Sequence, residues 1–203
     1  MEAMISDLLA GFPDAVLSAQ STFRAVMEAM ARPGTIQRVA ATVGVPSGLT
    51  RAAAALALTL FDHDTPVWLD PALATGPDVA TWLKFHTGAP VVAETVRASF
   101  ALIRDGGLLP DLESFALGSG EYPDRSTTLI LQVASLGEGR AYELRGPGID
   151  GAATLCTAIA PDDLFDRLAI NEELFPRGID VVLVHDDSMV AIPRTTRLVV
   201  AGG

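Results

Sequence analysis

Arginine is the residue type in this sequence best suited to binding anions. The chain has a single lysine, Lys84, against thirteen arginines. A guanidinium keeps its charge when buried and makes planar, forked contacts, which suits ion pairs, subunit contacts and phosphate groups. The pattern favours ion pairing within the fold or across a subunit contact, with an anion pocket as the alternative. The arginines that could form that pocket are Arg24, Arg32, Arg145 and Arg194.

A glycine-containing loop, Arg145-Gly146-Pro147-Gly148, follows a predicted strand. A loop at this place in a fold can turn backbone N–H groups toward an anion. The loop lacks the glycine spacing of a dinucleotide-binding turn and the Gly-Lys-Ser/Thr of a P-loop, and Pro147 removes one donor. A structural turn is therefore favoured over an anion nest.

Other residue types with catalytic potential do not form a recognised set. His63, His86 and His185 lack metal-ligand spacing, so no metal site is predicted. Residues 118–120 read Gly-Ser-Gly without the G-x-S-x-G pattern of a hydrolase. Lys84 lies in a predicted helix, where a lysine is usually solvated, so a Schiff base with pyridoxal phosphate is disfavoured. The residues alone predict no cofactor and leave open whether the chain is an enzyme.

Composition places the chain among globular proteins with one domain, spanning residues 1–203. The hydrophobic fraction is 49% and the charged fraction 19%. A net charge of −11 argues against nucleic-acid binding. The longest apolar run, residues 52–61, is too short to cross a membrane. A single cysteine, Cys156, excludes an intramolecular disulfide, and residues 1–8 lack the basic start of a signal peptide. A cytoplasmic location is expected.

The clearest local pattern joins a helix to a strand between residues 14 and 39. Apolar residues recur at helical spacing over Phe23, Val26, Met27 and Met30, which predicts one apolar stripe of an amphipathic helix from a cap at Asp14 to residue 31. Proline and glycine at positions 33 and 34 end that helix. Residues 35–39 then alternate as a half-buried strand does.

The remaining chain alternates predicted helices and strands. Helices are expected at 51–61, 79–85, 108–115 and 161–174, and strands at 67–69, 90–92, 99–103, 127–134 and 142–144. The strand at 142–144 is predicted to pair with 127–134 across a turn at 137–139, and 179–184 to form a hairpin with 189–192. This order predicts an α/β fold, a three-layer α/β/α sandwich around a mixed sheet.

Eight short phrases also lie in order along nearly the whole chain. They are F-R-x5-M-A-R-P-G (23–34), D-T-P-V-W-L (64–69), W-L-K-F-H-T-G-A (82–89), S-F-A-L (99–102), E-Y-P-x-x-S-T-T-L (121–129), L-R-G-P-G-I (144–149), F-P-R-G-I-D (175–180) and A-I-P-R-T-T (191–196). Each phrase alone is weak, but eight in register are specific. In this order they resemble PhnH, the H subunit family of the bacterial carbon–phosphorus lyase system, which serves phosphonate utilisation.

The resemblance implies a fold similar to pyridoxal-phosphate-dependent transferases but without the cofactor. It implies a homodimer that joins the G, I and J subunits in a complex. That complex supports ATP-dependent transfer of a phosphonate onto ribose, with displacement of adenine, to give an alkylphosphonate ribose triphosphate. The carbon–phosphorus bond is later cut by the iron–sulfur J subunit. Positions carried over as ligand or interface residues are Arg24, Arg32, His86, Arg145 and Arg194.

Two functions follow from these observations. The first is a non-catalytic, dimeric assembly subunit, with Trp68 and Trp82 as anchors of an apolar contact surface. The alternative is a catalytic or ligand-binding contributor that holds nucleotide or phosphonate in an arginine-lined cleft with the loop at 145–149. A pyridoxal-phosphate enzyme is a weaker third reading, because it would require Lys84 to line a pocket.

Overall fold

The structure is a computed structural model that describes residues 9–200, with side chains described to residue 198. Within those residues, seven strands form the main sheet in the order β1-β9-β8-β5-β4-β2-β3. In this order their bounds are Gln37–Arg38, Ser188–Ile192, Asp180–His185, Thr128–Gln132, Phe100–Ile103, Val67–Leu69 and Val91–Val92. The five strands from β8 to β3 run parallel, and β9 runs antiparallel to both β8 and β1. The predicted mixed sheet is therefore confirmed.

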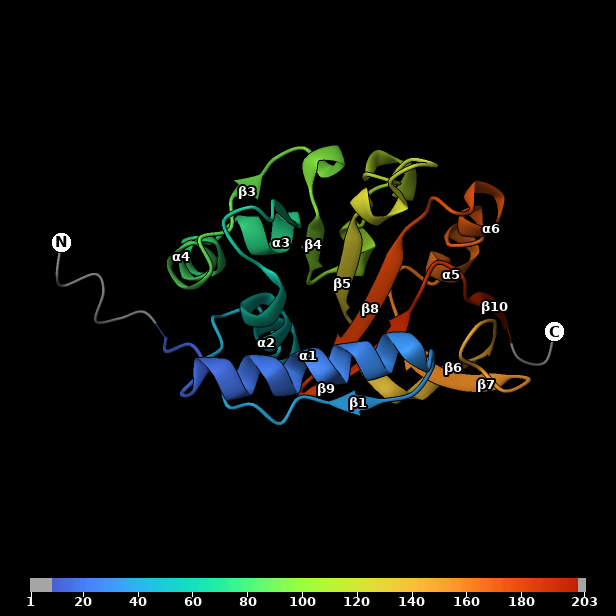
Figure 1. The fold of residues 1–203 in the computed structure, drawn as a ribbon, viewed down its shortest axis with the longest axis horizontal. Helices are drawn as coiled ribbons and strands as arrows, with labels where there is room; N and C mark the ends of the chain where they lie inside the picture. The colour runs from blue at the N-terminus through green and yellow to red at the C-terminus, as the bar shows by residue number, and fades with distance from the viewer. Residues whose placement is uncertain (1–8, 201–203) are drawn as a thin grey trace, which may run out of the picture.

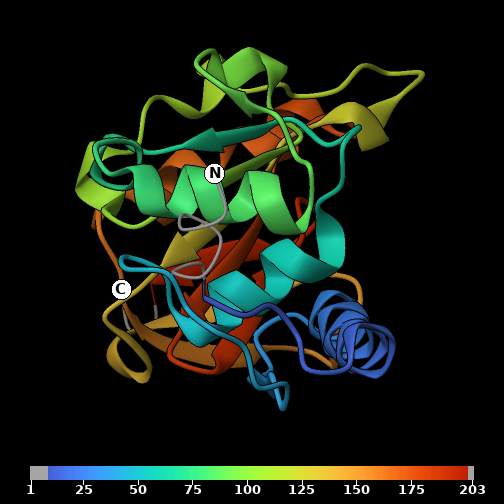
Figure 2. The same ribbon diagram turned by 90° about the vertical axis from the view of Figure 1, so that its left-hand side faces the viewer.

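Helices cover one face of this sheet (Figures 1 and 2). They are α1 (Ala15–Ala31), α2 (Arg51–Leu60), α3 (Pro71–Ala74) and α4 (Pro77–His86). The predicted cap of α1 is confirmed, because Asp14 Oδ1 accepts a hydrogen bond from Leu17 N at 3.0 Å. Thr50 Oγ1 caps α2 by accepting from Ala53 N at 3.2 Å. Residues 52–57 of α2 are all buried, and five of these six are alanines, whose small side chains allow the helix to approach the strands closely.

The other face of the main sheet packs on a smaller sheet. Within the described residues this sheet has three antiparallel strands, in the order β10 (Arg197–Val200), β6 (Ser135–Arg145) and β7 (Ala153–Ala158). Tyr142, Leu144 and Leu155 point from it into the same apolar cluster as Leu129 and Leu183 of the main sheet. The short helices α5 (Leu164–Arg167) and α6 (Ile170–Leu174) complete this layer. It is largely strand, so the predicted second helical layer is not confirmed.

The small sheet overturns one predicted pairing. Tyr142 and Leu144 pair with β7 and β10, not with the strand at 127–134. The expected hairpin turn at Gly137 and Gly139 lies inside β6, where the pairing register shifts between Leu136 and Arg140. Both glycines have positive φ, +105° and +114°. A bulge uses this conformation as readily as a turn does, so the glycines fit both arrangements. Strand β7 was not predicted at all.

Two predicted helices are also shorter than expected. In place of the helix predicted at 108–115 the structure has two single 3₁₀ turns, Gly106–Leu108 and Leu112–Ser114. Residues 161–174 hold α5 and α6 in place of one continuous helix. Further 3₁₀ turns in the described part of the chain are Thr95–Arg97 and Pro123–Arg125. The predicted hairpin of β8 and β9 is confirmed, with His185 paired to Ser188 at its turn.

Burial on α1 and at the tryptophans differs from prediction. Val26 is buried, whereas Phe23 and Met27 of the same predicted stripe are 49% and 53% exposed. Trp68 and Trp82, the expected surface anchors, are 8% and 1% exposed and belong to the two apolar clusters. Those tryptophans therefore stabilise the core, and the prediction that they anchor a partner is wrong.

No helix among the described residues is long and apolar enough to cross a membrane.

Candidate functional site

A groove of about 470 Å³ brings two of the predicted arginines together. Arg145 and the glycine loop form one part of it, Arg194 and Thr195 another, and α6 contributes Glu172. A further arginine that sequence reasoning missed, Arg197, lines the same space. The complete lining is Arg145, Gly146, Pro147, Asn171, Glu172, Phe175, Arg194, Thr195 and Arg197, which we call the arginine groove.

The walls of the groove carry two exposed arginines on paired strands. Arg145 ends β6 and Arg197 begins β10, and the two residues are direct partners in the antiparallel ladder. Each forms an ion pair with a glutamate: Arg145 Nε lies 2.6 Å from Glu143 Oε1, and Arg197 Nε lies 3.2 Å from Glu172 Oε1. The arginine side chains are 58% and 68% exposed. Both wall charges are therefore compensated at the surface, where water screens the ion pairs.

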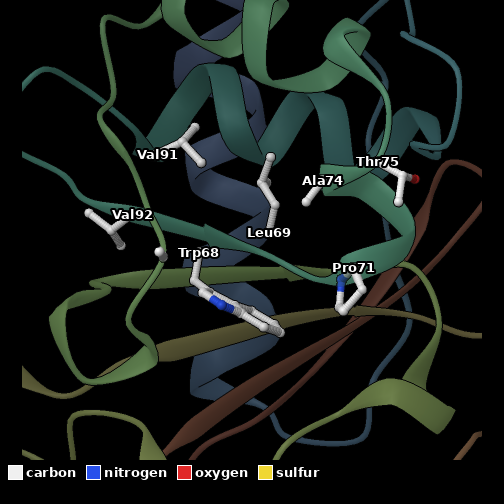
Figure 3. Close-up of a pocket in the computed structure, with 8 residues that line it drawn as sticks. Trp68, Leu69, Pro71, Ala74, Thr75, Val91 and Val92 are labelled. Atoms are coloured by element: carbon white, nitrogen blue, oxygen red, sulfur yellow. The ribbon is translucent and has the colours of Figure 1, made fainter.

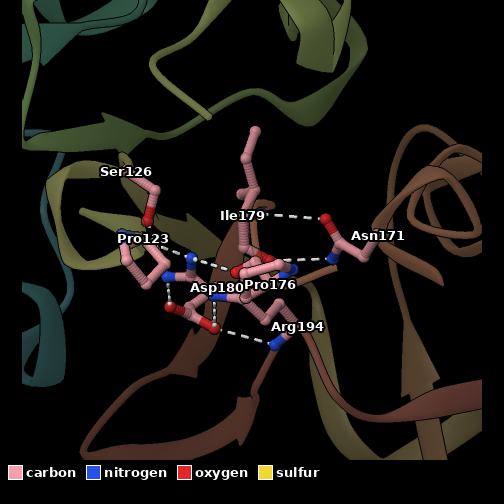
Figure 4. Close-up of polar contacts among 7 residues, drawn as sticks. All are labelled: Pro123, Ser126, Asn171, Pro176, Ile179, Asp180 and Arg194. Atoms are coloured by element: carbon pink, nitrogen blue, oxygen red, sulfur yellow. Dashed lines mark hydrogen bonds and ion pairs between the residues drawn. The ribbon is translucent and has the colours of Figure 1, made fainter. Parts of the chain in front are cut away.

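Arg194 belongs to a buried network beneath the groove (Figure 4). Its guanidinium pairs with both carboxylate oxygens of Asp180, and the side chains of both residues are 14% exposed. Nη2 also donates to Ser126 Oγ at 2.6 Å, and Nη1 donates to the carbonyl oxygen of Pro123 at 2.7 Å. The backbone N–H of Arg194 donates to Asp180 Oδ1 at 2.7 Å. Every guanidinium nitrogen has a protein partner, so this arginine connects segments of the fold.

Asn171 holds the neighbouring backbone in place. Its side-chain amide donates to the carbonyl oxygen of Ile179 and accepts from the N–H of Ile179, both at 2.9 Å (Figure 4). A Cβ at Gly178 would lie 2.5 Å from Asn171 Oδ1, and Gly178 has φ +143°, so glycine is required at this position. The clamp fixes the start of β8, which carries Asp180 toward Arg194.

The other predicted site residues lie outside the arginine groove. Arg24 is exposed on α1, and Arg32 is exposed at its end, 3.0 Å from Glu28 Oε1. The glycine loop nevertheless packs near Arg32, because a Cβ at Gly148 would lie 2.1 Å from the carbonyl oxygen of Ala31. His86 lies on α4, where its Nε2 is 2.9 Å from the carbonyl oxygen of Leu9 and its ring lies 5.0 Å from that of Trp82. The lining of the groove therefore includes neither Arg24, Arg32 nor His86.

A second polar region lies at the carboxyl ends of the parallel strands. Strand β3 lies on one side of β2 in the sheet, and the next strand in the chain, β4, lies on the other side. The order of the strands therefore reverses between β2 and β4. Ligands in open α/β sheets commonly bind at such a switch point. Here Asp70, which is fully buried, occupies it. Asp70 accepts from the N–H groups of Leu73 at 2.9 Å, Arg104 at 2.9 Å and Asp105 at 2.8 Å.

A hollow of about 530 Å³ adjoins this switch point, and Gln132 is one of its lining residues. Gln132 Oε1 accepts from Thr50 N at 2.5 Å, and Gln132 Nε2 donates to the carbonyl oxygen of Gly48 at 2.9 Å. The segment after β7 passes close by, since a Cβ at Gly106 would lie 1.6 Å from the carbonyl oxygen of Ala160. The side-chain amide of Gln132 therefore already has protein partners for both its oxygen and its nitrogen.

A third hollow lies beside the edge strand β3 and is mostly apolar. It measures about 580 Å³, and its lining includes Trp68, Pro71, Ala74 and Val91. Figure 3 shows the Trp68 indole lying along β2 and extending toward Pro71. The ring also packs edge-on against Phe115, with centroids 5.6 Å apart. The hollow is thus an opening over the core, with little polar chemistry in its lining.

Two further sequence-based readings can be compared with the geometry. In the described part of the chain, no group of three or more His, Cys, Asp or Glu side chains could hold a metal ion. Lys84 is exposed in the last turn of α4, away from the linings of the three hollows. A pyridoxal-phosphate enzyme would require a lysine that lines a pocket, and Lys84 lines none of those three hollows.

Comparison with known proteins identifies the family. Residues 10–199 match the family model described as bacterial phosphonate metabolism protein, PhnH. The chain belongs to the PhnH family. It is 45% identical over 187 residues to the alpha-D-ribose 1-methylphosphonate 5-triphosphate synthase subunit PhnH of Rhizobium meliloti strain 1021, covering 92% of this chain and 93% of the relative. It is also 31% identical over 184 residues to HtxG of Stutzerimonas stutzeri, named provisionally as a C-P lyase subunit protein, covering 90% and 87%.

Four of the eight phrases that resembled PhnH meet around Arg194. That arginine lies in A-I-P-R-T-T, binds Asp180 and Pro176 of F-P-R-G-I-D, and binds Ser126 of E-Y-P-x-x-S-T-T-L. The phrase L-R-G-P-G-I packs on the next residue, because a Cβ at Gly146 would lie 2.7 Å from the carbonyl oxygen of Thr195. Sequence reasoning missed Asp180 as a site residue, although it ends one of the quoted phrases. Its position three residues after Arg177 gave no reason to pair it with Arg194.

Proposed function

We propose that the chain is a non-catalytic assembly subunit of a carbon–phosphorus lyase complex in phosphonate catabolism. In that role it supports ATP-dependent formation of an alkylphosphonate ribose triphosphate. The observation that carries the proposal is the 45% identity, over 92% of the chain, to a protein named as a subunit of the corresponding synthase. The saturated contacts of Arg194 fit a structural role for the arginine that is most buried in the groove.

The partners in this proposal are the G, I and J subunits, in the cytoplasm, together with a second copy of this chain. Co-expression of the chain with those subunits, followed by affinity capture on one of them, tests the assembly. A stoichiometric complex that makes the ribose triphosphate only when this chain is present supports the proposal. An equally active complex that lacks the chain contradicts it.

For the homodimer, we propose that α1 forms the contact between two copies. Val16, Phe23 and Met27 lie on one side of α1 and are 65%, 49% and 53% exposed. A two-fold axis beside Ala25 of this helix would set Phe23 against Met27 of the partner subunit. The same antiparallel arrangement would bring Arg24 near the opposite charge of Glu28 of the partner subunit, so the surface is complementary to itself.

Substitution on α1 tests this contact. Met27→Glu places a charge in the apolar contact and is expected to convert dimer to monomer, measured by light scattering after size exclusion. Ser21→Glu adds the same charge to an exposed position on another side of α1 and is expected to leave the dimer intact. Dimers that persist in the Met27 variant, or a wild-type chain that is monomeric, would contradict this proposal.

The finer fold assignment belongs to the same proposal. We infer that the chain is one domain with a three-layer arrangement related to pyridoxal-phosphate-dependent transferases. The two apolar clusters lie on opposite faces of one sheet, which supports a single folding unit. Thermal unfolding followed by calorimetry is expected to give equal calorimetric and van't Hoff enthalpies, as for one cooperative unit. Two separate unfolding transitions would contradict a single domain.

A second function, ligand binding in the arginine groove, is favoured by one observation. The groove gathers Arg145, Arg194 and Arg197 around one hollow, although these residues belong to different parts of the sequence. Nucleotide or phosphonate would be the ligand, with Arg145 and Arg197 as the contacts open to solvent. Calorimetric titration of the isolated chain with each ligand tests this function, and heat that disappears in an Arg145→Gln variant would support it.

A further inference from the structure

The wall of the arginine groove places two positive charges directly opposite each other. Arg145 and Arg197 are partners in the β6–β10 ladder. Directly opposed residues on antiparallel strands have Cα atoms about 4.5–5.5 Å apart, and like charges in such pairs repel. Each charge is balanced by a separate glutamate, Glu143 from β6 and Glu172 from α6. The walls of the groove therefore contain two cations and two partly exposed counter-charges.

The ion pairs of Glu143 and Glu172 are weaker than the pair of Arg194 with Asp180, which we call the floor of the groove. The side chains of Glu143 and Glu172 are 40% and 49% exposed. Exposed ion pairs are worth little, since water and salt screen them. Asp180, in contrast, is 14% exposed and binds Arg194 through two oxygens. An incoming anion can thus replace the two glutamates while the floor stays fixed.

Replacement of both glutamates sets a requirement on the ligand. A single phosphate or phosphonate group carries at most about two negative charges, which two guanidiniums would have to share. A chain of two or three phosphates offers a separate anionic group to each guanidinium and displaces both carboxylates at once. Bidentate contacts of this kind suit arginine and phosphate.

We propose that the arginine groove binds a polyphosphate, with Arg145 and Arg197 each contacting a different phosphate group. This inference rests on the ligand-binding function proposed above and adds the chemical class of the ligand. The negative charge of the whole chain, −11, opposes binding of any polyanion, so detectable binding requires a local site such as this one.

The test uses the full chain and three probes: inorganic triphosphate, inorganic phosphate and methylphosphonate. Titration calorimetry at fixed salt is expected to show triphosphate binding at least tenfold tighter than either single-group probe. Arg145→Gln and Arg197→Gln are each expected to weaken triphosphate binding about tenfold. Arg38→Gln is the matched control, because Arg38 is also an exposed arginine, 78% exposed, near a carboxylate, Asp187.

The glutamates supply the sharpest measurement. Glu172→Gln removes a resident competitor, so triphosphate is expected to bind several-fold more tightly to this variant than to wild type. A merely structural ion pair would give no such gain. Unfolding curves of all variants, measured alongside, show that each binds as a folded protein.

The outcomes separate this inference from the function on which it rests. Phosphate or methylphosphonate binding as tightly as triphosphate, with loss in Arg145→Gln, would overturn the polyphosphate class and leave ligand binding in place. Equal weakening by Arg38→Gln would mean general surface attraction and would overturn the inference. Absence of binding for all three probes, in wild type and in Glu172→Gln, would overturn both the inference and the ligand-binding function.

Discussion

The switch point between β2 and β4 and the arginine groove are both polar, but different groups occupy them. At the switch point a buried carboxylate, Asp70, accepts three backbone N–H bonds from its own chain. At the groove, exposed arginines are balanced by exposed glutamates. A buried group with all its partners is costly to displace, whereas a screened surface pair is not. The buried carboxylate at the common ligand position of α/β sheets is thus already bound by its own chain, and the more easily displaced charges lie at the arginine groove.

The largest expected effect comes from opening the switch point. Asp70→Ala leaves three N–H groups without their acceptor in a buried place, which is expected to cost about 4 kcal/mol of the free energy of unfolding. Chemical denaturation with two-state analysis measures it. Asp70→Asn keeps the shape and one acceptor oxygen and is the matched control, with a smaller expected loss. If Asp70→Ala lowered the free energy of unfolding by no more than a surface substitution does, Asp70 would not stabilise the switch point.

The second-largest effect is expected at the floor of the groove. Arg194→Ala leaves Asp180 largely buried without its partner, which is expected to lower the free energy of unfolding by about 3 kcal/mol. The free energy of unfolding is measured again, together with an Arg194→Ala/Asp180→Ala double variant. The double variant is expected to be no less stable than the single one, because removal of both partners leaves no unpaired charge. Additive losses in the double variant would mean that the two side chains act separately.

The walls of the groove are expected to contribute little to stability. Arg145→Ala and Arg197→Ala each remove an exposed ion pair, so each is expected to cost less than about 1 kcal/mol. Thermal and chemical unfolding measure this difference from Arg194→Ala. If either wall variant were as unstable as the Arg194 variant, floor and walls would form one structural network and the contrast between them would fail.

The smallest effect is expected at a solvated carboxylate that resembles Asp70 in its bonding. Asp62 accepts from Thr65 Oγ1 at 2.6 Å and from Asp64 N at 2.9 Å, but it is exposed. The hydrogen bond from Thr65, and then that from Asp64, lowers the pKa of Asp62 below its ordinary value. Its contribution to stability is therefore present above the ordinary pKa and is lost as pH falls through the lowered one.

The pH titration of Asp62 by NMR, in wild type and in Thr65→Val, measures this contribution. The Thr65 variant is expected to move the pKa of Asp62 back toward its ordinary value, with little change in stability at neutral pH. A large loss of stability at neutral pH would show that exposure does not separate Asp62 from Asp70.

Local structure was predictable from the sequence where neighbouring residues determine it. The cap at Asp14 and the hairpin of β8 and β9 are confirmed, because side chain to backbone bonds and short turns depend on residues close in sequence. The phrases that resembled PhnH identified the family, since eight of them occur in register. They also selected Arg145 and Arg194, which the structure brings to one groove.

Tertiary partners were not predictable in the same way. Strand β6 begins directly after β5, yet it pairs in another sheet, and the choice depends on β7 and β10. Phe23 and Met27 fit a core stripe by spacing, but α1 presents the side with Val26 to the sheet. Arg197 joins Arg145 only through the ladder register. Pairing and helix rotation are decided by contacts distant in sequence, which periodicity does not contain.

The two ends of the main sheet also constrain how this protein meets other chains. The outermost strands, β1 and β3, are each two residues long. An outer strand this short exposes few unpaired backbone groups, and the Arg38 side chain of β1 adds a solvated charge there. Short outer strands, and a charged side chain on one of them, resist strand-by-strand addition of another polypeptide, which is how many sheets aggregate. Association without aggregation is therefore left to helix surfaces and side-chain contacts, of which α1 offers the most apolar example.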